Sequence, residues 1–491
     1  MTRTLMCRRV QDRSRRARGE PLTSAARTMT SAHQTLERLT AEAAQSGDDH
    51  RTQRIELGTS AVDALLPFLE ARRPDVADLV IGDAHTWEAA GARVAERLRS
   101  GGRLVRSLIL EPRAGDDHLV CEDGVIASLE TLIATSPSIN LVAVGAGSIN
   151  DICKVASHRR GLPYICVPTA ASMNGYTSSI AAVLSAGVKR TWPVHQPLGV
   201  FADVDVIREA PLVMNRAGFG DLLSKPYCQA DWLLSHHVRG VPYSAEAAGV
   251  LDGPWNQMID AAAGIGEGEA AATHVLMETL LVSGFSMAMA GTSAPASGAE
   301  HLISHYWDME EHGQDRTVRG LHGTQVGIGT RISSRTLWRL MDVTADEVLS
   351  AAETAGERRP DDAWIARLGD HHPDLTEAIV EEIQEQFRKK QRHGDELRQE
   401  LETLGRSWEQ VREELRAILI PTERIDHALA QAGCITRPSE LRVDLAHMTR
   451  TIQYCRHIRA RYVNFDLLAD LGTLDAMAEA IAVEVEDSAH G

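Results

Sequence analysis

A change of hydrophobic pattern near residue 210 constrains the fold of this 491-residue chain more than any other feature. Before that point, segments of helical periodicity alternate with apolar runs typical of strands, which lie at 79–83, 104–110, 141–144 and 164–169. Strands separated by helical segments of about 10–15 residues are typical of a parallel sheet with crossover helices. After Ala210 the strand pattern disappears, and long stretches rich in Ala, Leu and Met indicate helices. We therefore predict an α/β domain with a parallel sheet, followed by an all-helical domain.

The predicted domain boundaries follow from the same pattern and give an α/β domain over 51–210 and a helical domain over 211–491. The stretches expected to be helical in the second domain are 245–263, 269–291, 298–312, 320–342 and 374–418. Residues 1–50 are expected to form a leader that is disordered or not translated. Its first 28 residues carry eight arginines against two acidic residues, and Met29 offers a second start. A transit peptide is the alternative interpretation, whereas the apolar core of a secretory signal is missing.

The composition limits the partners and the compartment. The formal charge of −17 repels nucleic acid and anionic membranes, so we expect neither as a main partner. The longest apolar runs are far shorter than the ~20 residues of a membrane helix. Seven scattered cysteines without a CxxC pair argue against a disulfide framework and a cysteine zinc site, and they favour a cytoplasmic location.

A glycine-rich turn is the most informative local motif. The apolar run at 141–144 leads directly into Gly145-Ala146-Gly147-Ser148, and a helical pattern follows up to Gly161. Glycines let a backbone turn tightly and approach a ligand, and the free N–H groups at a helix start attract an anion. The turn therefore fits the diphosphate of a dinucleotide. A tight strand-to-helix connection that needs glycine only for packing is the alternative interpretation.

Asp83 ends the run at 79–83, where an acidic residue can accept a hydrogen bond from the ribose of a dinucleotide. A helix cap in front of Thr86 is an equally good interpretation of the same residue.

Three segments of the helical half offer ligands for a divalent metal. Asp221 follows two glycines in AGFGDLLSK, His301 and His305 are spaced i, i+4 in SGAEHLISHYWD, and His322 lies between two glycines in RGLHGTQV. One carboxylate and two imidazoles leave an open coordination position, as in a catalytic metal site, for zinc, nickel or iron. The alternatives are that Asp221 pairs with Lys225 one turn later and that the histidine spacing arises by chance.

The motifs GAGSINDICK, PTAASMNGYTSS, AGFGDLLSKPYCQADW, SGAEHLISHYWD and LHGTQV occur in this order. Together they resemble the sn-glycerol-1-phosphate dehydrogenase family. That family belongs to the superfamily of iron-containing alcohol dehydrogenases, glycerol dehydrogenase and 3-dehydroquinate synthase. The resemblance implies a dehydroquinate synthase-like fold, in which an NAD(P)-binding α/β domain precedes a helical metal-binding domain.

The resemblance also implies roles for individual residues. The residues expected to contact NAD or NADP are Gly145, Ala146, Gly147, Ser148, Ile149, Thr169, Ser172, Ser178 and Asp83. Asp221, His301 and His322 match the metal ligands, and His305 matches a histidine that contacts the substrate beside the metal. Asn174 stands where many relatives have a substrate-contacting aspartate, and it hydrogen-bonds without carrying a charge. An unperturbed pKa near 6.5 would suit His305 to proton relay.

The function implied is a metal-dependent NAD(P)H oxidoreductase that interconverts dihydroxyacetone phosphate and sn-glycerol 1-phosphate, and we expect a homo-oligomer. Lys189, Arg190 and Lys225 are candidate counter-charges for the substrate phosphate, although Lys189-Arg190 is also typical of a solvated turn. The alternatives are a polyol dehydrogenase for another hydroxy-ketone, a sugar-phosphate cyclase like 3-dehydroquinate synthase and a non-catalytic relative. The cyclase is disfavoured because PTAASMNGYTSS lacks the glycine- and lysine-bearing form usual there.

Overall fold

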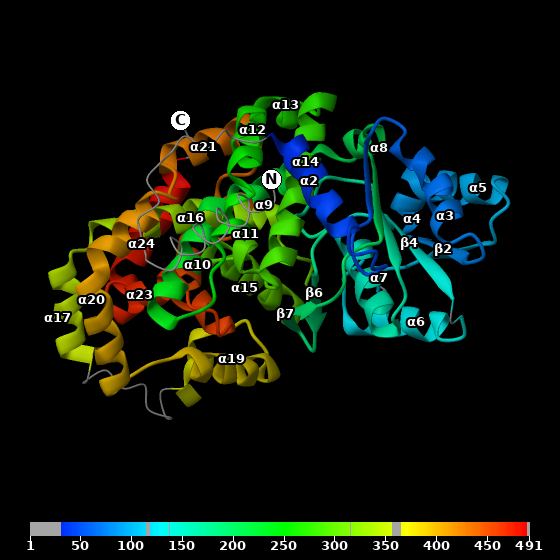
Figure 1. The fold of residues 1–491 in the computed structure, drawn as a ribbon. Coiled ribbons are helices and arrows are strands. Elements are labelled where there is room, and N and C mark those ends of the chain that lie inside the picture. Colours follow the sequence, from blue (N-terminus) through cyan, green and yellow to red (C-terminus); the bar gives the residue numbers. More distant parts are fainter. Residues whose placement is uncertain (1–30, 114–117, 137, 315, 356–364, 489–491) are drawn as a thin grey trace, which may run out of the picture. The chain divides into compact units, whose positions relative to one another are not determined.

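A computed structural model describes residues 31–113, 118–136, 138–314, 316–355 and 365–488. A six-stranded sheet with the order β1-β8-β5-β4-β2-β3 occupies the first half of the chain, and all of its neighbouring strands are parallel (Figure 1). The strands are β1 Arg54–Gly58, β2 Ala77–Gly82, β3 Val105–Ile109, β4 Ile139–Gly145, β5 Tyr164–Pro168 and β8 Gly199–Asp203. The four predicted strands correspond to β2, β3, β4 and β5, so the predicted α/β class is confirmed.

Apart from a two-stranded hairpin, helices make up the remaining regular structure of the described residues. In the α/β part they are α2 Ala32–Ala44, α3 Leu65–Arg72, α4 Ala84–Thr86, α5 Ala92–Ser100, α6 Asp123–Ile133, α7 Gly147–Arg160 and α8 Val204–Glu209. After the sheet come α9 Leu212–Leu223, α10 Lys225–Arg239, α11 Ala245–Gly249, α12 Asp252–Asp260, α13 Ala262–Glu267, α14 Ala270–Ala290, α15 Ala299–Gly313, α16 His322–Asp342 and α17 Ala345–Ala355. The last are α19 Glu377–Lys390, α20 Gly394–Arg416, α21 Thr422–Gln431, α22 Leu445–Tyr454, α23 Asn464–Asp470 and α24 Leu474–Asp487. No strand follows β8 in the part of the chain that the structure describes, as the hydrophobic pattern predicted.

Helices cover both faces of the sheet (Figure 1). On one face, Val80 and Val142 pack with the apolar side chains of α3 and α5, such as Leu69 and Val94. Their chain neighbours point to the opposite face, which α6 and α7 cover. Because both faces are buried, the strands consist of continuous apolar runs instead of alternating ones. This explains why apolar runs alone located the sheet in the sequence.

A β-hairpin between β5 and β8 corrects the expectation of a solvated turn at Lys189-Arg190. The antiparallel strands β6 Ile180–Ser185 and β7 Val188–Pro193 are joined by the two residues Ala186 and Gly187, which both have positive φ. A two-residue loop of this type is most often marked by Asn-Gly or Asp-Gly. Because Ala-Gly is not such a signal, the sequence did not indicate the hairpin.

Helix α2 corrects part of the predicted leader. Residues 32–44 form a helix with a capping box at Ser31, and this helix buries Leu36 and Leu39 in the main core. The spacing of these two apolar residues is a helical signal. The prediction of a leader followed the arginine-rich composition of the preceding segment instead. Residues 1–30 lie outside the described residues.

Helix α14 is long and apolar enough to cross a membrane by length and composition. However, 78% of its most apolar window is buried within the protein. It is the one helix of this kind among the described residues, and its surroundings are those of a core helix.

Glycines bring three helices of the helical part unusually close together. A Cβ on Gly323 of α16 would overlap the backbone oxygen of Ala217 in α9, and one on Gly220 would overlap the backbone oxygen of Gly323. In the same way, a Cβ on Gly329 of α16 would overlap the backbone oxygen of Glu300 in α15. The residues next to these contacts include Asp221, so the glycines set the spacing of the predicted metal ligands.

We predict that Gly323→Ala destabilises the protein by about 1–3 kcal/mol, because the added methyl group meets backbone that cannot rotate away. Urea unfolding followed by circular dichroism measures the loss. Gly124→Ala in α6 is the matched control, because a Cβ there meets no atom within 4 Å. That variant should be as stable as the wild type or slightly more stable. Equal stability of the Gly323 variant and the wild type would contradict the close crossing.

A buried arginine connects α16 to the last helices of the chain. Arg331 is fully buried, and its guanidinium donates to Asp426 Oδ1 of α21 at 2.7 Å and to the backbone oxygen of Val485 in α24 at 2.7 Å. Arg335 donates to the other carboxylate oxygen of Asp426 at 2.8 Å. Burial alone would raise the pKa of Asp426, but the hydrogen bonds with both guanidinium groups lower it overall.

The lowered pKa of Asp426 predicts a pH-dependent contribution to stability. A carboxyl group whose pKa is lower in the folded state stabilises the fold above its unfolded pKa, about 3.9, and this stabilisation is lost as the pH falls through the folded pKa. We expect Asp426→Asn to lower the free energy of unfolding by roughly 1–3 kcal/mol at pH 7. The difference from the wild type should shrink as the pH falls below about 4. Urea titrations at pH 3 to 7 measure it, and a constant difference would contradict the assignment.

Candidate active site

The glycine turn lies where the order of strands in the sheet reverses. From β2 the chain moves outward to β3 and then returns to the other side of β2, where β4, β5 and β8 follow. In open parallel sheets, ligands bind outside the carboxyl ends of the strands at this reversal point. Gly145 ends β4, α7 begins two residues later, and no side chain of the described residues caps its first N–H groups. The predicted phosphate-binding turn therefore has the position and the free donors that a diphosphate needs.

Asp83 follows β2, the strand beside β4, and therefore lies at the same edge of the sheet. Its carboxylate accepts a hydrogen bond from the backbone N–H of Thr86 at 2.8 Å and forms a capping box at the start of α4. The structure thus shows the capping interaction, and a contact between Asp83 and a ribose stays a prediction.

The loop after β5 joins the glycine turn to the helical part. Its first residue, Thr169, is buried, and its backbone N–H donates to the Gly145 oxygen at 3.3 Å. Further along, the side chain of Met173 lies over Gly147. The backbone N–H of Asn174 then donates to Asp221 Oδ2 at 3.0 Å. Two of the predicted regions, for cofactor and for metal, are therefore connected by one short loop.

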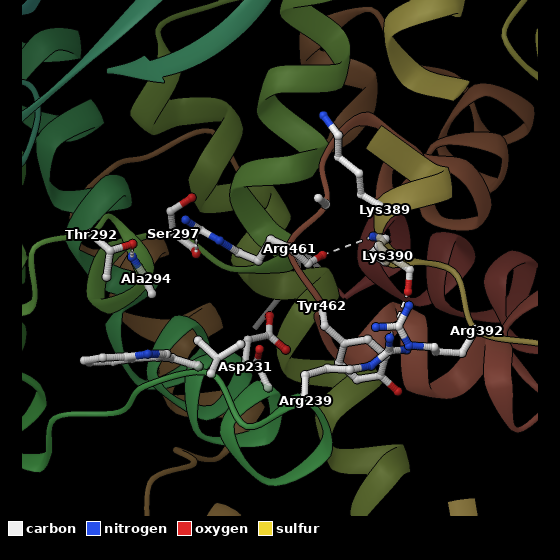
Figure 2. Close-up of a pocket in the computed structure, with 14 residues that line it drawn as sticks. Asp231, Arg239, Thr292, Ala294, Ser297, Lys389, Lys390, Arg392, Arg461 and Tyr462 are labelled. Carbon is white, nitrogen blue, oxygen red and sulfur yellow. Dashed lines mark hydrogen bonds between the residues drawn. The ribbon is translucent and has the colours of Figure 1, made fainter. Parts of the chain in front are cut away.

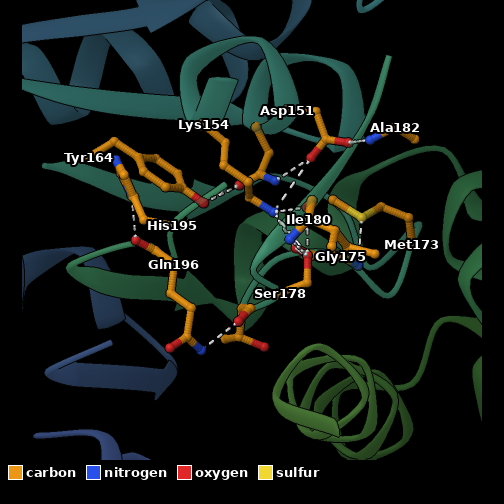
Figure 3. A network of polar contacts seen from close by, with 12 residues as sticks. Asp151, Lys154, Tyr164, Met173, Gly175, Ser178, Ile180, Ala182, His195 and Gln196 are labelled. Atoms are coloured by element: carbon orange, nitrogen blue, oxygen red, sulfur yellow. Dashed lines mark hydrogen bonds and ion pairs between the residues drawn. The ribbon is translucent and has the colours of Figure 1, made fainter. Parts of the chain in front are cut away.

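A buried lysine fixes the second half of this loop (Figure 3). Lys154 of α7 is fully buried, and its ammonium group donates to the backbone oxygens of Gly175 at 2.6 Å and Ile180 at 3.1 Å and to Ser178 Oγ at 3.2 Å. Asp151, at 3.6 Å, is its ionic partner. Burial lowers the pKa of Lys154, and Asp151 opposes this shift. Sequence patterns gave no signal for this contact, because a lysine within a helix is ordinarily exposed.

Two predicted cofactor contacts in the same loop have protein partners. The hydroxyl of Ser178 is fully buried, and its one proton has two possible acceptors within the loop, the backbone oxygens of Gly175 at 2.9 Å and Ile180 at 2.8 Å. Ser172 lies with its hydroxyl 3.5 Å from that of Tyr176. The structure gives Ser178 a role in the shape of the loop, and cofactor contacts by either serine stay predictions.

Asp221, His301 and His322 meet at one point in the helical part. They come from α9, α15 and α16, and one ligand atom of each lies within 4.8 Å of the other two. Among the described residues, this is the one group of three or more His, Cys, Asp and Glu with such a spacing. Asp221 Oδ1 lies 3.3 Å from His301 Nε2 and, although it is buried, accepts no hydrogen bond of good geometry from any described residue. A buried carboxylate oxygen without a donor, next to imidazole nitrogen, fits a divalent cation.

The second nitrogen of each imidazole is held by α15. His301 Nδ1 lies 2.9 Å from Glu300 Oε1, which also accepts a hydrogen bond from the backbone N–H of Gly298 at 2.7 Å. His322 Nδ1 lies 2.9 Å from Ser304 Oγ. Metal-binding histidines are usually oriented through the ring nitrogen that does not bind the metal. Both Nε2 atoms are thus left for a metal ion, and that of His301 lies 3.3 Å from Asp221 Oδ1.

The protonation of the three residues follows from burial and from their neighbours. Burial alone would raise the pKa of Asp221, but the imidazoles of His301 and His322 lower it overall. Burial alone would lower the pKa of His301, but the carboxylates of Asp221 and Glu300 raise it overall. Burial lowers the pKa of His322 to about 4, although Asp221 opposes the shift. Ionised Asp221 and neutral His322 are in the states that a metal requires of its ligands.

His305 lies beside this group, with its ring centroid 5.6 Å from that of His322 and 6.1 Å from that of His301. Its pKa corrects the expected value near 6.5. Burial lowers the pKa of His305 well below that value, and the charge of Arg459 lowers it further. His305 is therefore a neutral imidazole, and its buried Nδ1 has no hydrogen-bond partner in the described part of the chain.

Arg459 is a residue that sequence reasoning missed. It donates to the Lys189 backbone oxygen at 2.7 Å and to Thr191 Oγ1 at 2.9 Å on strand β7, and it has no ion pair with a described acidic residue. Burial lowers the pKa of Arg459 to about 9, and the neighbouring cations Arg461 and Arg190 add to this effect. No motif marks Arg459, because the long helical region separates it from the hairpin in sequence.

The three cations predicted for a substrate phosphate differ in their surroundings. Arg190 forms an ion pair with Glu382 of α19 at 3.1 Å, so its charge is already balanced. Lys189 Nζ lies 3.8 Å from Asp308 Oδ2. Lys225 follows Asp221 by one helical turn and is 1% exposed, and its ammonium group has no hydrogen-bond partner among the described residues.

Comparison with known proteins decides the family. A family model described as iron-containing alcohol dehydrogenase matches residues 56–211. A glycerol-1-phosphate dehydrogenase from Bacillus velezensis is 37% identical over 328 residues, which are 64% of this chain and 81% of the relative. A glycerol-1-phosphate dehydrogenase from Geobacillus thermodenitrificans is 33% identical over 335 residues, which are 66% of this chain and 82% of the relative. The chain belongs to the glycerol-1-phosphate dehydrogenase family.

Solved structures of proteins with lower sequence identity share the fold. A probable glycerol dehydrogenase from Sinorhizobium meliloti superposes with a TM-score of 0.53 at 17% identity, over 87% of this chain and 98% of the other. An NADH-dependent butanol dehydrogenase from Thermotoga maritima gives a TM-score of 0.54 at 11% identity, over 88% of this chain and 97% of the other. This chain thus has the predicted arrangement of a parallel sheet followed by helices.

A separate cavity of about 290 Å³ lies among α10, the end of α19 and the segment around Arg461 (Figure 2). Several basic side chains line it, but two of them already have acidic partners. Lys390 pairs with Asp466 at 2.9 Å, and Arg239 pairs with Glu400 at 2.9 Å. The guanidinium of Arg461 donates to the Ser293 hydroxyl at 2.6 Å. These contacts give the basic groups a structural role, and we assign no ligand to the cavity.

Proposed function

We propose that the protein is a metal-dependent NAD(P)H oxidoreductase that interconverts dihydroxyacetone phosphate and sn-glycerol 1-phosphate. The observation that carries this proposal is the meeting of Asp221, His301 and His322 next to the loop that reaches the glycine turn. The family relatives, named glycerol-1-phosphate dehydrogenase with NAD(P)+ as cofactor, support the same reaction.

The dinucleotide is proposed to bind at the carboxyl ends of β2, β4 and β5. The N–H groups at the start of α7 would bind its diphosphate, because their dipoles point toward an anion at that position. The loop held by Lys154 extends from this turn toward Asp221, so the nicotinamide end would face the metal ligands. This orientation supports a contact by Asn174, whose side-chain amide is buried without a partner for its nitrogen among the described residues.

Asp221, His301 and His322 are proposed to hold one divalent cation, which can be zinc, nickel or iron. When bound, such a cation acts as a Lewis acid toward a substrate oxygen that gains negative charge. Because the ligands are one carboxylate and two neutral imidazoles, a bound divalent cation would keep a net positive charge, which favours this role. Glu300 and Ser304 fix the ring orientations before the cation binds, so little reorganisation is needed.

His305 is proposed to contact the substrate through its unpartnered Nδ1. Because its imidazole is neutral, it can donate or accept one hydrogen bond there, depending on its tautomer. A proton would leave or reach the substrate hydroxyl through this contact. Its lowered pKa also means that His305 does not carry the proton as a stable charge at neutral pH.

Lys189, Lys225 and Arg459 are the cations proposed to bind the substrate phosphate. Lys225 and Arg459 lack an ionic partner among the described residues, and a phosphate dianion would balance their charges. Arg459 is the strongest candidate, because its charge acts on His305 and its planar guanidinium suits a phosphate.

Self-association of the chain and a cytoplasmic location stay predictions.

The function is tested by measuring bound metal and the oxidation of NADH and NADPH with dihydroxyacetone phosphate and dihydroxyacetone. Oxidation with the phosphate ester supports the proposal. His301→Ala should lose both the metal and the activity, because it removes a proposed ligand. His305→Ala should keep the metal and lose turnover by about 10²–10⁴-fold, the usual contribution of a proton-transfer group. Full metal content in the His301 variant would contradict the ligand assignment.

The phosphate contact gives a separate prediction for Arg459. Arg459→Met should raise the KM for dihydroxyacetone phosphate by about 10–100-fold, since a charge-assisted hydrogen bond contributes about 1.5–3 kcal/mol. Steady-state kinetics with dihydroxyacetone, which has no phosphate, should show little change. Arg190→Met is the matched control, because Glu382 already balances that charge. An equal effect of the Arg459 substitution on both substrates would contradict a phosphate contact.

A further inference from the structure

A chain of three buried side chains extends from His322 away from the proposed metal site. Ser304 Oγ lies 2.9 Å from His322 Nδ1 and 2.6 Å from Gln325 Oε1. Gln325 Nε2 in turn lies 3.2 Å from Asp308 Oδ1. Ser304 and Gln325 are fully buried, and Asp308 is 6% exposed. Ser304 and Asp308 are one turn apart on α15, as are His322 and Gln325 on α16, so the chain bridges the two helices.

The chemistry of Asp308 determines the direction of every hydrogen bond in this chain. Its Oδ1 accepts the hydrogen bond from Gln325, so the NH₂ end of the Gln325 amide must face it. The same NH₂ group also faces a second acceptor, the Gly320 backbone oxygen at 3.5 Å. The carbonyl end of Gln325 therefore faces Ser304, and the single hydroxyl proton of Ser304 is used to donate to it.

The direction of these hydrogen bonds determines which ring nitrogen of His322 carries the proton. Because the only proton of the Ser304 hydroxyl is engaged with Gln325, the oxygen can only accept from His322. His322 must then carry its proton on Nδ1, which leaves the lone pair on Nε2. Without Gln325, the Ser304 hydroxyl would be free to rotate and donate to Nδ1, and the proton of His322 would then lie on Nε2.

We propose that Gln325, acting through Ser304 and oriented by Asp308, fixes His322 in the tautomer that presents a free Nε2 to the metal ion. Gln325, Ser304 and Asp308 are thus positioning residues. Lys189 Nζ lies 3.8 Å from Asp308 Oδ2 at the far end of the chain. The inference rests on the proposed metal site and adds to it the residues that select the state of one ligand.

The experiment measures the dissociation constant of Zn²⁺ for the full-length protein by competition with a chromophoric chelator. Ser304→Ala and Gln325→Leu should each weaken Zn²⁺ binding by about 10–100-fold, the usual effect of losing such a supporting contact. Ser334→Ala is the matched control, because this serine is also buried, lies in α16, and donates its hydroxyl to the Arg331 backbone oxygen within that helix. The control should bind Zn²⁺ with the affinity of the wild type.

A double substitution tests whether Zn²⁺ affinity depends on the direction of these hydrogen bonds or only on the packing of the side chains. Gln325→Glu with Asp308→Asn keeps the shape and the total charge, and the amide of residue 308 would now donate to the carboxylate of residue 325. That carboxylate still accepts from Ser304, so Zn²⁺ affinity should return to within a few-fold of the wild type. Long-range ¹H–¹⁵N spectra of the metal-free protein, labelled at histidine, should show the Nδ1–H tautomer for His322 in the wild type and double variant and its loss in Gln325→Leu.

The outcomes distinguish this inference from the proposed function. Wild-type protein that binds no Zn²⁺, Ni²⁺ or Fe²⁺ would overturn the metal site itself. If the wild type binds the metal and both single variants bind it within two-fold of the wild type, the metal site stands and the positioning chain is wrong. If Gln325→Leu weakens binding and the double variant is equally weak, the side chains act only by packing, and the inference is again overturned.

Discussion

The contact between α9 and α16 at Gly220 and Gly323 is the constraint on which the rest of the site depends. At this crossing, each helix approaches the other so closely that any side chain larger than hydrogen would meet backbone. Gly329 brings α15 to α16 in the same way. A side-chain metal site requires ligand atoms within a few ångströms of one another, and helices packed at the usual 8–10 Å do not guarantee this. The glycines therefore control whether three ligands from three helices can share one cation.

The close packing also places charged groups where water is excluded. Asp221, Glu300 and Lys154 are buried, and each of them is held by donors, acceptors or charges that offset the loss of hydration. Such networks raise the cost of any rearrangement, because a lost partner leaves a buried polar group unsatisfied. The loop between β5 and β6 gains its fixed shape in this way, with Lys154 on one side and Asp221 on the other. The glycine turn after β4 and the metal ligands are thereby kept in one fixed arrangement.

Sequence patterns predicted the elements whose signals are local. The buried strands are continuous apolar runs, and the turn after β4 contains its glycines within four residues. The i, i+4 spacing of His301 and His305 was also visible, and the structure places them together. In contrast, the hairpin β6–β7 was missed because its Ala-Gly turn is a weak signal. The neutral state of His305 was missed because its pKa depends on burial and on Arg459, which is distant in sequence.

The sequence by itself determined the class of fold, the glycine turn and the identity of the candidate ligands, because hydrophobic period, helix signals and residue chemistry act over a few neighbouring residues. Tertiary structure alone decided which of these residues meet, that Arg190 pairs with Glu382, that the charge of Arg459 lowers the pKa of His305, and that Lys154 orders the loop beside Asp221. Each of these contacts joins segments that are separate in sequence. Burial and electrostatic balance arise only when such segments pack together, so no local pattern records them.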